Sequence, residues 1–277
     1  MKYLLGMTIA IALSLSTLDS AHDGEARAQT SAAEKNQRPV IVELFTSEGC
    51  STCPPADALL VRFEEQQPVD GAEIIALEEH VDYWNQQGWS DPFSASEWTL
   101  RQQEYVAAFK GDAAYTPQMI VDGQSQFIGS RIREVMAGIG EASRSSKTNV
   151  VMAPIAAGEN RTQQVTVSVG KLVGGTDGDT AEVWLAVTEK GLHSDVSRGE
   201  NAGKNLHHAA IVRWMRKVGV ADGRKIPLSF AGNTSVKLKP AWNLENLRVV
   251  VFVQEKKSRR ILGASSMKIL NQIHPNT

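Results

Sequence analysis

A short segment, Cys50-Ser51-Thr52-Cys53, constrains the fold of this chain more than any other part of its sequence. It follows residues 40–46, an apolar run typical of a buried strand. It continues into Pro54-Pro55, which favours the first turn of a helix because proline needs no N–H there. These are the only two cysteines in 277 residues. A strand, a Cys-x-x-Cys turn and a helix in this order predict a thiol–disulfide redox site.

The first 28 residues predict a secretory signal peptide. Lys2 gives a positive start, residues 4–18 are predominantly apolar and uncharged, and Ala26-Arg27-Ala28 has the pattern of a cleavage site. The apolar run is shorter than the ~18 residues that indicate a membrane span, so an uncleaved anchor is the less favoured alternative. We therefore expect a periplasmic or secreted protein that leaves the membrane after cleavage. Its compartment is oxidising, and a disulfide persists there.

The rest of the chain is long enough for two domains. Residues 29–38 are polar and are expected to form a linker. Residues 39–148 then predict alternating strands and helices, with a hairpin across Asp122-Gly123. The expected strands are residues 40–46, 73–77, 118–121 and 126–128, and the expected helices are residues 54–66, 94–109 and 130–142. Strand, helix, strand, helix, strand, strand, helix is the order of the thioredoxin fold.

Residues 149–277 predict a mainly-β, sandwich-like domain, because short apolar strands alternate with turn signals. The expected strands are residues 165–169, 181–187, 226–230, 235–238 and 247–253. A helix is expected over residues 209–218. The predicted fold class is therefore an α/β thioredoxin-like N-terminal domain followed by a separate mainly-β domain.

The two cysteines have different expected roles. Cys50 is the attacking residue, because the start of a helix lowers the pKa of a thiol and exposes a thiolate. Cys53, one turn further, resolves the mixed disulfide. A purely stabilising disulfide is the alternative, but a four-residue loop gains only about 2 kcal/mol, against about 3 kcal/mol for fifteen residues. In thioredoxin-like proteins a cis proline at the start of the third strand faces the cysteines and presents backbone to a substrate. Thr116-Pro117 resembles that arrangement in position, so we expect a cis peptide there, with an ordinary trans turn proline as the alternative.

Residues that follow the second strand are candidates for tuning the cysteines. The ends of parallel strands meet at one edge of a sheet, so His80 and Asp82 are expected near Cys50, as proton acceptor for Cys53 or as pKa-tuning groups. A satisfied turn is the alternative. The aromatic residues of this region favour a small local core over an apolar lip for a partner peptide; they are Trp84, Trp89 and Phe93.

Other classes of function are weighed against this one. Two thiolates with His80 suit Cu(I) or zinc, but a closed zinc site needs four ligands and the sequence has no second cysteine pair. A periplasmic copper chaperone that uses the same cysteines is therefore an alternative, as is a non-catalytic interaction module. His207 and His208 are adjacent, so their side chains point apart and form a poor chelate. Residues 198–201, where charged residues and glycine cluster, favour a solvated loop over a functional site. The net charge of −2 and the absence of a basic stripe exclude nucleic-acid binding. No cofactor and no resident metal are expected.

The chain resembles an exported bacterial family called domain of unknown function 1223. The resemblance covers nearly all of the expected mature chain and rests on residues 42–57, 80–84, 88–93, 115–118 and 199–203. It implies a thioredoxin-like N-terminal domain and a β-rich C-terminal one, and it names no reaction. We expect a thiol–disulfide oxidoreductase that acts on a protein or small-thiol substrate, with a redox partner that the sequence does not identify.

Overall fold

The structure is a computed structural model that describes residues 37–158 and 161–269. The predicted signal peptide, residues 1–28, and most of the predicted linker lie outside the described residues. Within the described part of the chain, no helix is both long enough and apolar enough to cross a membrane.

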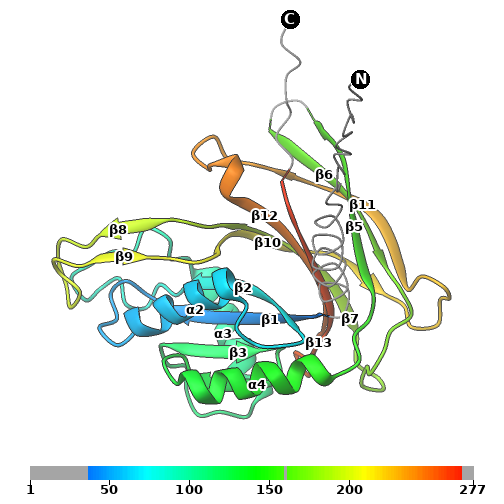
Figure 1. Ribbon diagram of the computed structural model, residues 1–277, viewed down its shortest axis with the longest axis horizontal. Helices are drawn as coiled ribbons and strands as arrows, with labels where there is room; N and C mark the ends of the chain where they lie inside the picture. Colours follow the sequence, from blue (N-terminus) through cyan, green and yellow to red (C-terminus); the bar gives the residue numbers. More distant parts are fainter. Residues whose placement is uncertain (1–36, 159–160, 270–277) are drawn as a thin grey trace, which may run out of the picture. The chain divides into compact units, whose positions relative to one another are not determined.

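The first seven elements follow the order that the sequence predicts (Figure 1). They are β1 (Arg38–Thr46), α2 (Pro54–Gln66), β2 (Ala72–His80), α3 (Ser96–Ala108), β3 (Gln118–Val121), β4 (Ser125–Ile128) and α4 (Ile132–Arg144). β1 lies parallel to β2 and antiparallel to β3. The carboxyl ends of β1 and β2 therefore meet at one edge of the sheet, where α2 begins.

The remaining elements are almost all strands. They are β5 (Val150–Gly158), β6 (Thr162–Val169), β7 (Ala181–Glu189), β8 (His193–Asp195), β9 (Asn205–His207), β10 (Ile211–Ala221), β11 (Phe230–Lys237), the 3₁₀ turn η1 (Leu244–Asn246), β12 (Leu247–Glu255) and β13 (Ile261–Lys268). β11, β6 and β5 form a small sheet, and β8 pairs with β9. Valines of β6 pack against those of β7 and β12. β11 replaces the two short strands predicted at residues 226–230 and 235–238.

The predicted architecture, an α/β thioredoxin-like domain over residues 39–148 and a separate sandwich-like domain over residues 149–277, is wrong. One mixed eight-stranded sheet, in the order β13-β12-β7-β10-β2-β1-β3-β4, runs through both parts. The two parts join because β10 pairs in parallel with β2, Ile211 opposite Glu78. The described chain is mostly β, with three α-helices. Hydrophobic patterns show which face of a strand is buried, but they do not identify a partner strand far along the chain.

The helix predicted over residues 209–218 is also wrong, because this segment forms β10. The pairing of β10 with β7 shifts register between Val212 and Trp214, and again between Lys217 and Gly219. A bulge inserts an extra residue and so moves the inward–outward alternation by one position. The apolar residues of β10 consequently lose the period of two that identifies a strand, and their spacing favours a helix.

Side chains alternate between the faces of the sheet and give each helix its own apolar surface. On β2, Ile74 and Ala76 belong to the core formed with α2 and α4, whereas Ile75 belongs to the core on the side of α3. Residues two apart in a strand share a face. Glu78 and His80, at the end of β2, therefore lie on the α2 face, and both are buried.

The β3–β4 turn ties the N-terminal hairpin to the C-terminal strands and confirms the turn predicted across Asp122-Gly123. Asp122 Oδ1 accepts a hydrogen bond from the Ile41 N–H at 2.9 Å, and the Asp122 carbonyl accepts one from the Ile261 N–H at 2.9 Å. Gly123 has a φ of +66°, and a Cβ there would lie 1.9 Å from the carbonyl oxygen of Arg259. Glycine is needed both for this backbone conformation and for the close approach.

We expect Gly123→Ala to lower the free energy of unfolding far more than Gly71→Ala. Gly71 also has a positive φ, +77°, but a Cβ there meets no atom within 4 Å. Gly71→Ala therefore measures backbone strain alone, about 1 kcal/mol. Gly123→Ala adds a clash with the backbone of Arg259, so its free energy of unfolding should fall by at least about 2 kcal/mol more than that of Gly71→Ala. Urea unfolding compares the two variants, and equal losses would disprove the role of this contact.

Candidate functional site

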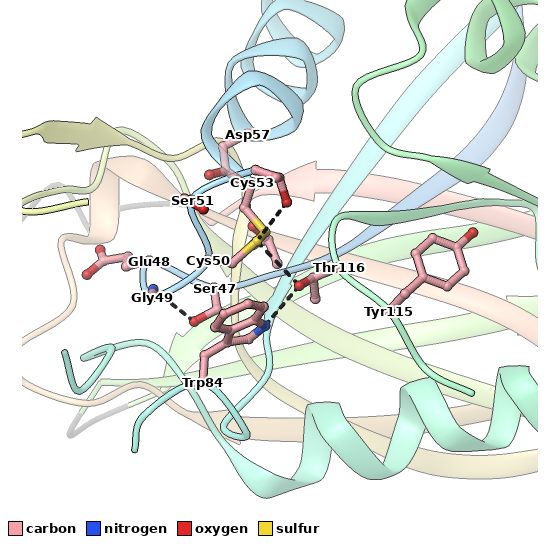
Figure 2. The surroundings of a disulfide bond; sticks show 12 residues. Ser47, Glu48, Gly49, Cys50, Ser51, Cys53, Asp57, Trp84, Tyr115 and Thr116 are labelled. Atoms are coloured by element: carbon pink, nitrogen blue, oxygen red, sulfur yellow. Dashed lines mark hydrogen bonds between the residues drawn. A yellow bond between two sulfur atoms is a disulfide. The ribbon is translucent and has the colours of Figure 1, made fainter. Parts of the chain in front are cut away.

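The disulfide lies where β1 passes into α2. Cys50 and Cys53 are bonded, their Cα atoms are 5.4 Å apart, and both residues are fully buried (Figure 2). Cys53 is the N-cap residue of α2, and its carbonyl accepts hydrogen bonds from the N–H groups of Ala56 and Asp57. Cys50 precedes the first turn of the helix, where the positive end of the helix dipole favours a thiolate.

Two hydroxyl groups lie at hydrogen-bond distance from the Cys50 sulfur. Thr116 Oγ1 donates to Cys50 Sγ at 3.4 Å, and Thr52 Oγ1 lies 3.4 Å from the same sulfur. Trp84 Nε1 in turn donates to Thr116 Oγ1 at 2.9 Å (Figure 2). The Thr116–Pro117 peptide bond is cis, as the sequence predicts. The loop after β2 and the turn before β3 therefore meet at this sulfur.

Residues 196–204, which we call the clasp loop, hold the backbone around the disulfide. Asn201 is fully buried, and its Nδ2 donates to the carbonyl oxygens of Glu48, at 2.8 Å, and Cys50, at 2.9 Å. The solvated loop expected over residues 198–201 is therefore wrong for Asn201. A residue far along the chain fixes the backbone on both sides of Gly49.

A glycine in the clasp loop allows this close approach. Gly199 has a φ of +78°, and a Cβ there would lie 3.1 Å from the Cβ of Trp89. The next residue, Glu200, accepts a hydrogen bond from the Ser51 N–H at 3.1 Å. Trp89 Nε1 donates to Glu48 Oε2 at 2.7 Å. The clasp loop thus packs against the loop after β2, and both contact the segment that carries the cysteines.

Two histidines and three carboxylates form a buried cluster beside the disulfide loop, which we call the histidine network. His80 Nδ1 lies 2.7 Å from Asp91 Oδ2, and His80 Nε2 lies 3.2 Å from Glu78 Oε1. His208 Nδ1 lies 2.8 Å from the same Glu78 oxygen, and His208 Nε2 lies 3.0 Å from Glu48 Oε1. An ionised carboxylate only accepts hydrogen bonds, so all four ring nitrogens donate and both imidazoles are cationic.

The charges in the histidine network stabilise one another. Burial alone would lower the pKa of His80, but Asp91 and Glu78 outweigh it and raise this pKa well above its usual value. Burial likewise opposes the charge of His208, yet Glu78 and Glu48 raise its pKa to about 9. Burial would raise the pKa of Glu78, but His208 and His80 lower it to about 2. These groups therefore all stay charged near neutral pH.

Asp57 is a further buried carboxyl, one helical turn after Cys53 (Figure 2). Residues four apart on a helix are neighbours, so this carboxyl lies beside the second cysteine. Thr46 Oγ1 donates to Asp57 Oδ1 at 2.6 Å, whereas Asp57 Oδ2 has no hydrogen-bond partner. Burial, together with the charge of Glu78, raises the pKa of Asp57 to about 7. Asp57 is therefore poised to take up or release a proton at neutral pH.

The structure separates the two residues that the sequence proposes for tuning the cysteines. His80 belongs to the histidine network. Asp82 instead accepts a hydrogen bond from Thr99 Oγ1 at 2.6 Å, at the start of α3. The ring of Phe93 packs edge-on against His80 and His208, with centroid distances of 5.5 and 5.4 Å. Phe93 therefore contributes to a local core around the network.

Three buried residues of this site are absent from the sequence prediction: Asp57, Asn201 and His208. Asp57 and Asn201 lie in segments on which the family resemblance rests, residues 42–57 and 199–203, and this was the one available signal for them. Adjacent His207 and His208 form a poor chelate because their side chains point apart, and this same geometry places the His208 ring in the network and leaves His207 exposed.

Asn201→Ala removes both amide contacts to the disulfide loop, which leaves the Glu48 carbonyl without a donor and the Cys50 carbonyl with the Cys53 N–H alone. We expect the free energy of unfolding to fall by about 2–4 kcal/mol and dithiothreitol to reduce the disulfide faster. Asn205→Ala is the matched control, because Asn205 Nδ2 donates to Asp195 at an exposed position, and it should change little. A reduction rate for Asn201→Ala equal to that of the wild type would contradict the role of the clasp loop.

The raised pKa of Asp57 predicts how stability depends on pH. Its ordinary value, 3.8, applies to the unfolded chain, and its folded value is about 7. Between these values the folded state holds a proton that the unfolded state has lost, so stability falls as pH rises through this window and then levels off. The Asp57→Asn variant has no carboxyl to titrate at this position, so it does not lose stability in this way as pH rises. Its stability relative to the wild type should rise by up to about 4 kcal/mol between pH 4 and pH 8, measured by urea unfolding, whereas a constant difference would contradict the shift.

Comparison with known proteins identifies the family. The profile of a family described as "Protein of unknown function (DUF1223)" matches residues 41–254. The structure is similar to that of a protein from Agrobacterium tumefaciens solved by a structural genomics consortium. The TM-score is 0.64 and the identity 27%, over 87% of this chain and 98% of that chain.

HBP35 of Porphyromonas gingivalis shares the fold at 16% identity, with a TM-score of 0.59 over 87% of this chain and 80% of that chain. No curated protein matches. The family profile covers most of the chain, and it agrees with the resemblance seen in the sequence. The chain therefore belongs to the family of proteins of unknown function called DUF1223.

Proposed function

We propose that this protein is an exported thiol–disulfide oxidoreductase that acts on protein or small-thiol substrates in the periplasm or outside the cell. The observation that supports this most is the position of the two cysteines, which form a Cys-x-x-Cys disulfide at the start of α2 with two hydroxyl groups at the Cys50 sulfur. A disulfide that closes so short a loop adds only about 2 kcal/mol to stability. Reversible exchange explains this placement better than stabilisation does.

In the reduced protein, Cys50 is the attacking residue. Its thiolate displaces one sulfur of a substrate disulfide, which forms a mixed disulfide and releases one substrate thiolate. The Cys53 thiolate then attacks Cys50 Sγ, forms the Cys50–Cys53 disulfide and releases the second substrate thiolate. Two electrons pass from the protein to the substrate, and the same steps in reverse oxidise a substrate dithiol.

The neighbouring residues have distinct roles in this exchange. The Thr116 hydroxyl, which donates to Cys50 Sγ in the disulfide form, stabilises the Cys50 thiolate in the reduced form. The backbone at Thr116 and Pro117 orients the substrate. Asp57, beside Cys53, accepts the proton of the Cys53 thiol, because its second carboxylate oxygen is buried and has no other partner. His80 acts on the cysteines only through the field of the histidine network, since Asp91 and Glu78 occupy both of its nitrogens.

A substrate reaches Cys50 only after a covering side chain moves, because this residue is fully buried in the disulfide form. Trp84 fits the covering role, since it is partly exposed and its indole N–H reaches Thr116 at the sulfur (Figure 2). The copper-chaperone alternative has less support. The disulfide occupies both sulfurs, which are the ligands that Cu(I) would need.

The reactivity of the reduced protein tests the proposal. We expect alkylation of Cys50 by iodoacetamide to follow a midpoint below the value of about 8.5 of a free thiol. Thr116→Val removes the hydroxyl donor and should raise this midpoint by about one pH unit, since a hydrogen bond to a charged group is worth about 1.5–3 kcal/mol. Thr116→Ser retains the hydroxyl and is the matched control. Mass spectrometry after timed alkylation at each pH gives the midpoint.

An unreactive Cys50 in the reduced protein would reject the proposal. If Cys50 of the reduced protein resists alkylation across neutral pH and forms no mixed disulfide with glutathione, the cysteine pair is a passive crosslink. The Cys53→Ser variant serves in the glutathione experiment, because its mixed disulfide cannot be resolved and accumulates.

A further inference from the structure

Three potential ligand atoms of the histidine network converge on one point. Glu78 Oε1 lies 3.2 Å from His80 Nε2 and 2.8 Å from His208 Nδ1, and the three atoms all lie within 4.8 Å of one another. None of the three side chains is exposed. Two imidazoles and one carboxylate form the ligand set of His₂Glu zinc sites, and imidazole also suits other first-row transition metals.

The two separations from Glu78 Oε1 are close to those around a bound ion, and the two ring nitrogens lie within 4.8 Å of each other. Two ligands about 2.05 Å from a tetrahedral ion lie about 3.3 Å from each other. The separation between His80 Nε2 and Glu78 Oε1 is already near this value. The separation between His208 Nδ1 and Glu78 Oε1 needs to widen by about 0.5 Å, which a small rotation of either side chain provides.

The outer nitrogens have the partners that metal-bound histidines require. His80 Nδ1 pairs with Asp91 at 2.7 Å, and His208 Nε2 pairs with Glu48 at 3.0 Å. A carboxylate behind a metal-bound histidine fixes the ring and makes its free nitrogen a better donor to the metal. These carboxylates are themselves held, because Trp89 Nε1 donates to Glu48 Oε2 at 2.7 Å and the Glu48 N–H donates to Asp91 Oδ2 at 2.8 Å.

We propose that Glu78, His80 and His208 bind a divalent transition-metal ion of the zinc class, with Glu48 and Asp91 as the outer partners of the histidines. One divalent ion takes the place of the two protons on the inner nitrogens, so the net charge of the buried cluster does not change. The site contains no cysteine. It therefore goes beyond the proposed function, and it stands whether or not the disulfide exchanges.

His208 lines a cavity of about 570 Å³ that Glu64 and Glu65 border, but its side chain is fully buried, so an ion reaches the ring only when a neighbouring side chain moves.

The test is metal binding by the folded, disulfide-intact protein after treatment with a chelator. Titration with Zn²⁺ is followed by calorimetry, and titration with Co²⁺ by visible absorption. We expect one tight equivalent, a Co²⁺ spectrum of low-coordinate type without the near-ultraviolet band that a thiolate ligand produces, and a higher thermal midpoint with bound Zn²⁺. Mg²⁺ should not compete, because it prefers an octahedral set of oxygen ligands.

Matched variants locate the ion. His208→Gln should weaken Zn²⁺ binding at least about 100-fold, whereas His207→Gln, which changes the exposed neighbour, should bind like the wild type. The double variant Cys50→Ser/Cys53→Ser should also bind like the wild type.

Three results would overturn the proposal. They are no binding of Zn²⁺ or Co²⁺ by the wild-type protein at micromolar concentration, equal affinities of His208→Gln and His207→Gln, and loss of binding in the double cysteine variant. Circular dichroism checks that His208→Gln is folded. If it is not, Glu78→Gln takes its place, and the wild-type spectrum with Co²⁺ still decides between nitrogen and sulfur ligands.

Discussion

The pairing of β10 with β2 is the contact on which the rest of the structure depends. Glu78 makes this contact with both its backbone and its side chain. Its N–H donates to the Ala210 carbonyl at 2.9 Å, and its carboxylate accepts from the Ala209 N–H at 2.6 Å and from the His208 ring at 2.8 Å. The pairing joins both parts of the chain into one sheet. It also places His208 against His80 and brings the clasp loop to the start of α2.

The charged groups gathered at this junction are difficult to explain by stability alone. Burying an ion is costly, and replacing a buried ion pair with well-packed apolar residues is often neutral or stabilising. Strongly perturbed carboxyls and histidines therefore point to chemistry more than to structural support. Here these charged groups lie beside the protein's disulfide, and Glu48 links them to it. The Glu48 side chain pairs with His208, and the Glu48 carbonyl accepts a hydrogen bond from the Asn201 side-chain amide, which also donates to the Cys50 carbonyl.

The sequence predicted the parts of the structure that depend on local patterns. The Cys50–Cys53 motif and the Asp122-Gly123 turn each follow from a few adjacent residues, whereas the cis peptide at Thr116–Pro117 is expected from the likeness of its segment to that of thioredoxin-like proteins. The joined sheet and the clasp loop depend on contacts between residues far apart in the chain, and bulges in β10 hide even its strand character. Asn201 and His208 act only through such contacts, so no spacing in the sequence identifies their partners.

The reduction potential of the Cys50–Cys53 pair tests the central claim most directly. Equilibration of the protein with glutathione or dithiothreitol buffers, followed by alkylation and mass spectrometry, gives this value. A pair that exchanges with substrate thiols should have a potential between about −300 and −120 mV, in the range of known disulfide oxidoreductases and of the glutathione pool. A potential below about −300 mV would contradict the claim, because it would identify the disulfide as a structural crosslink.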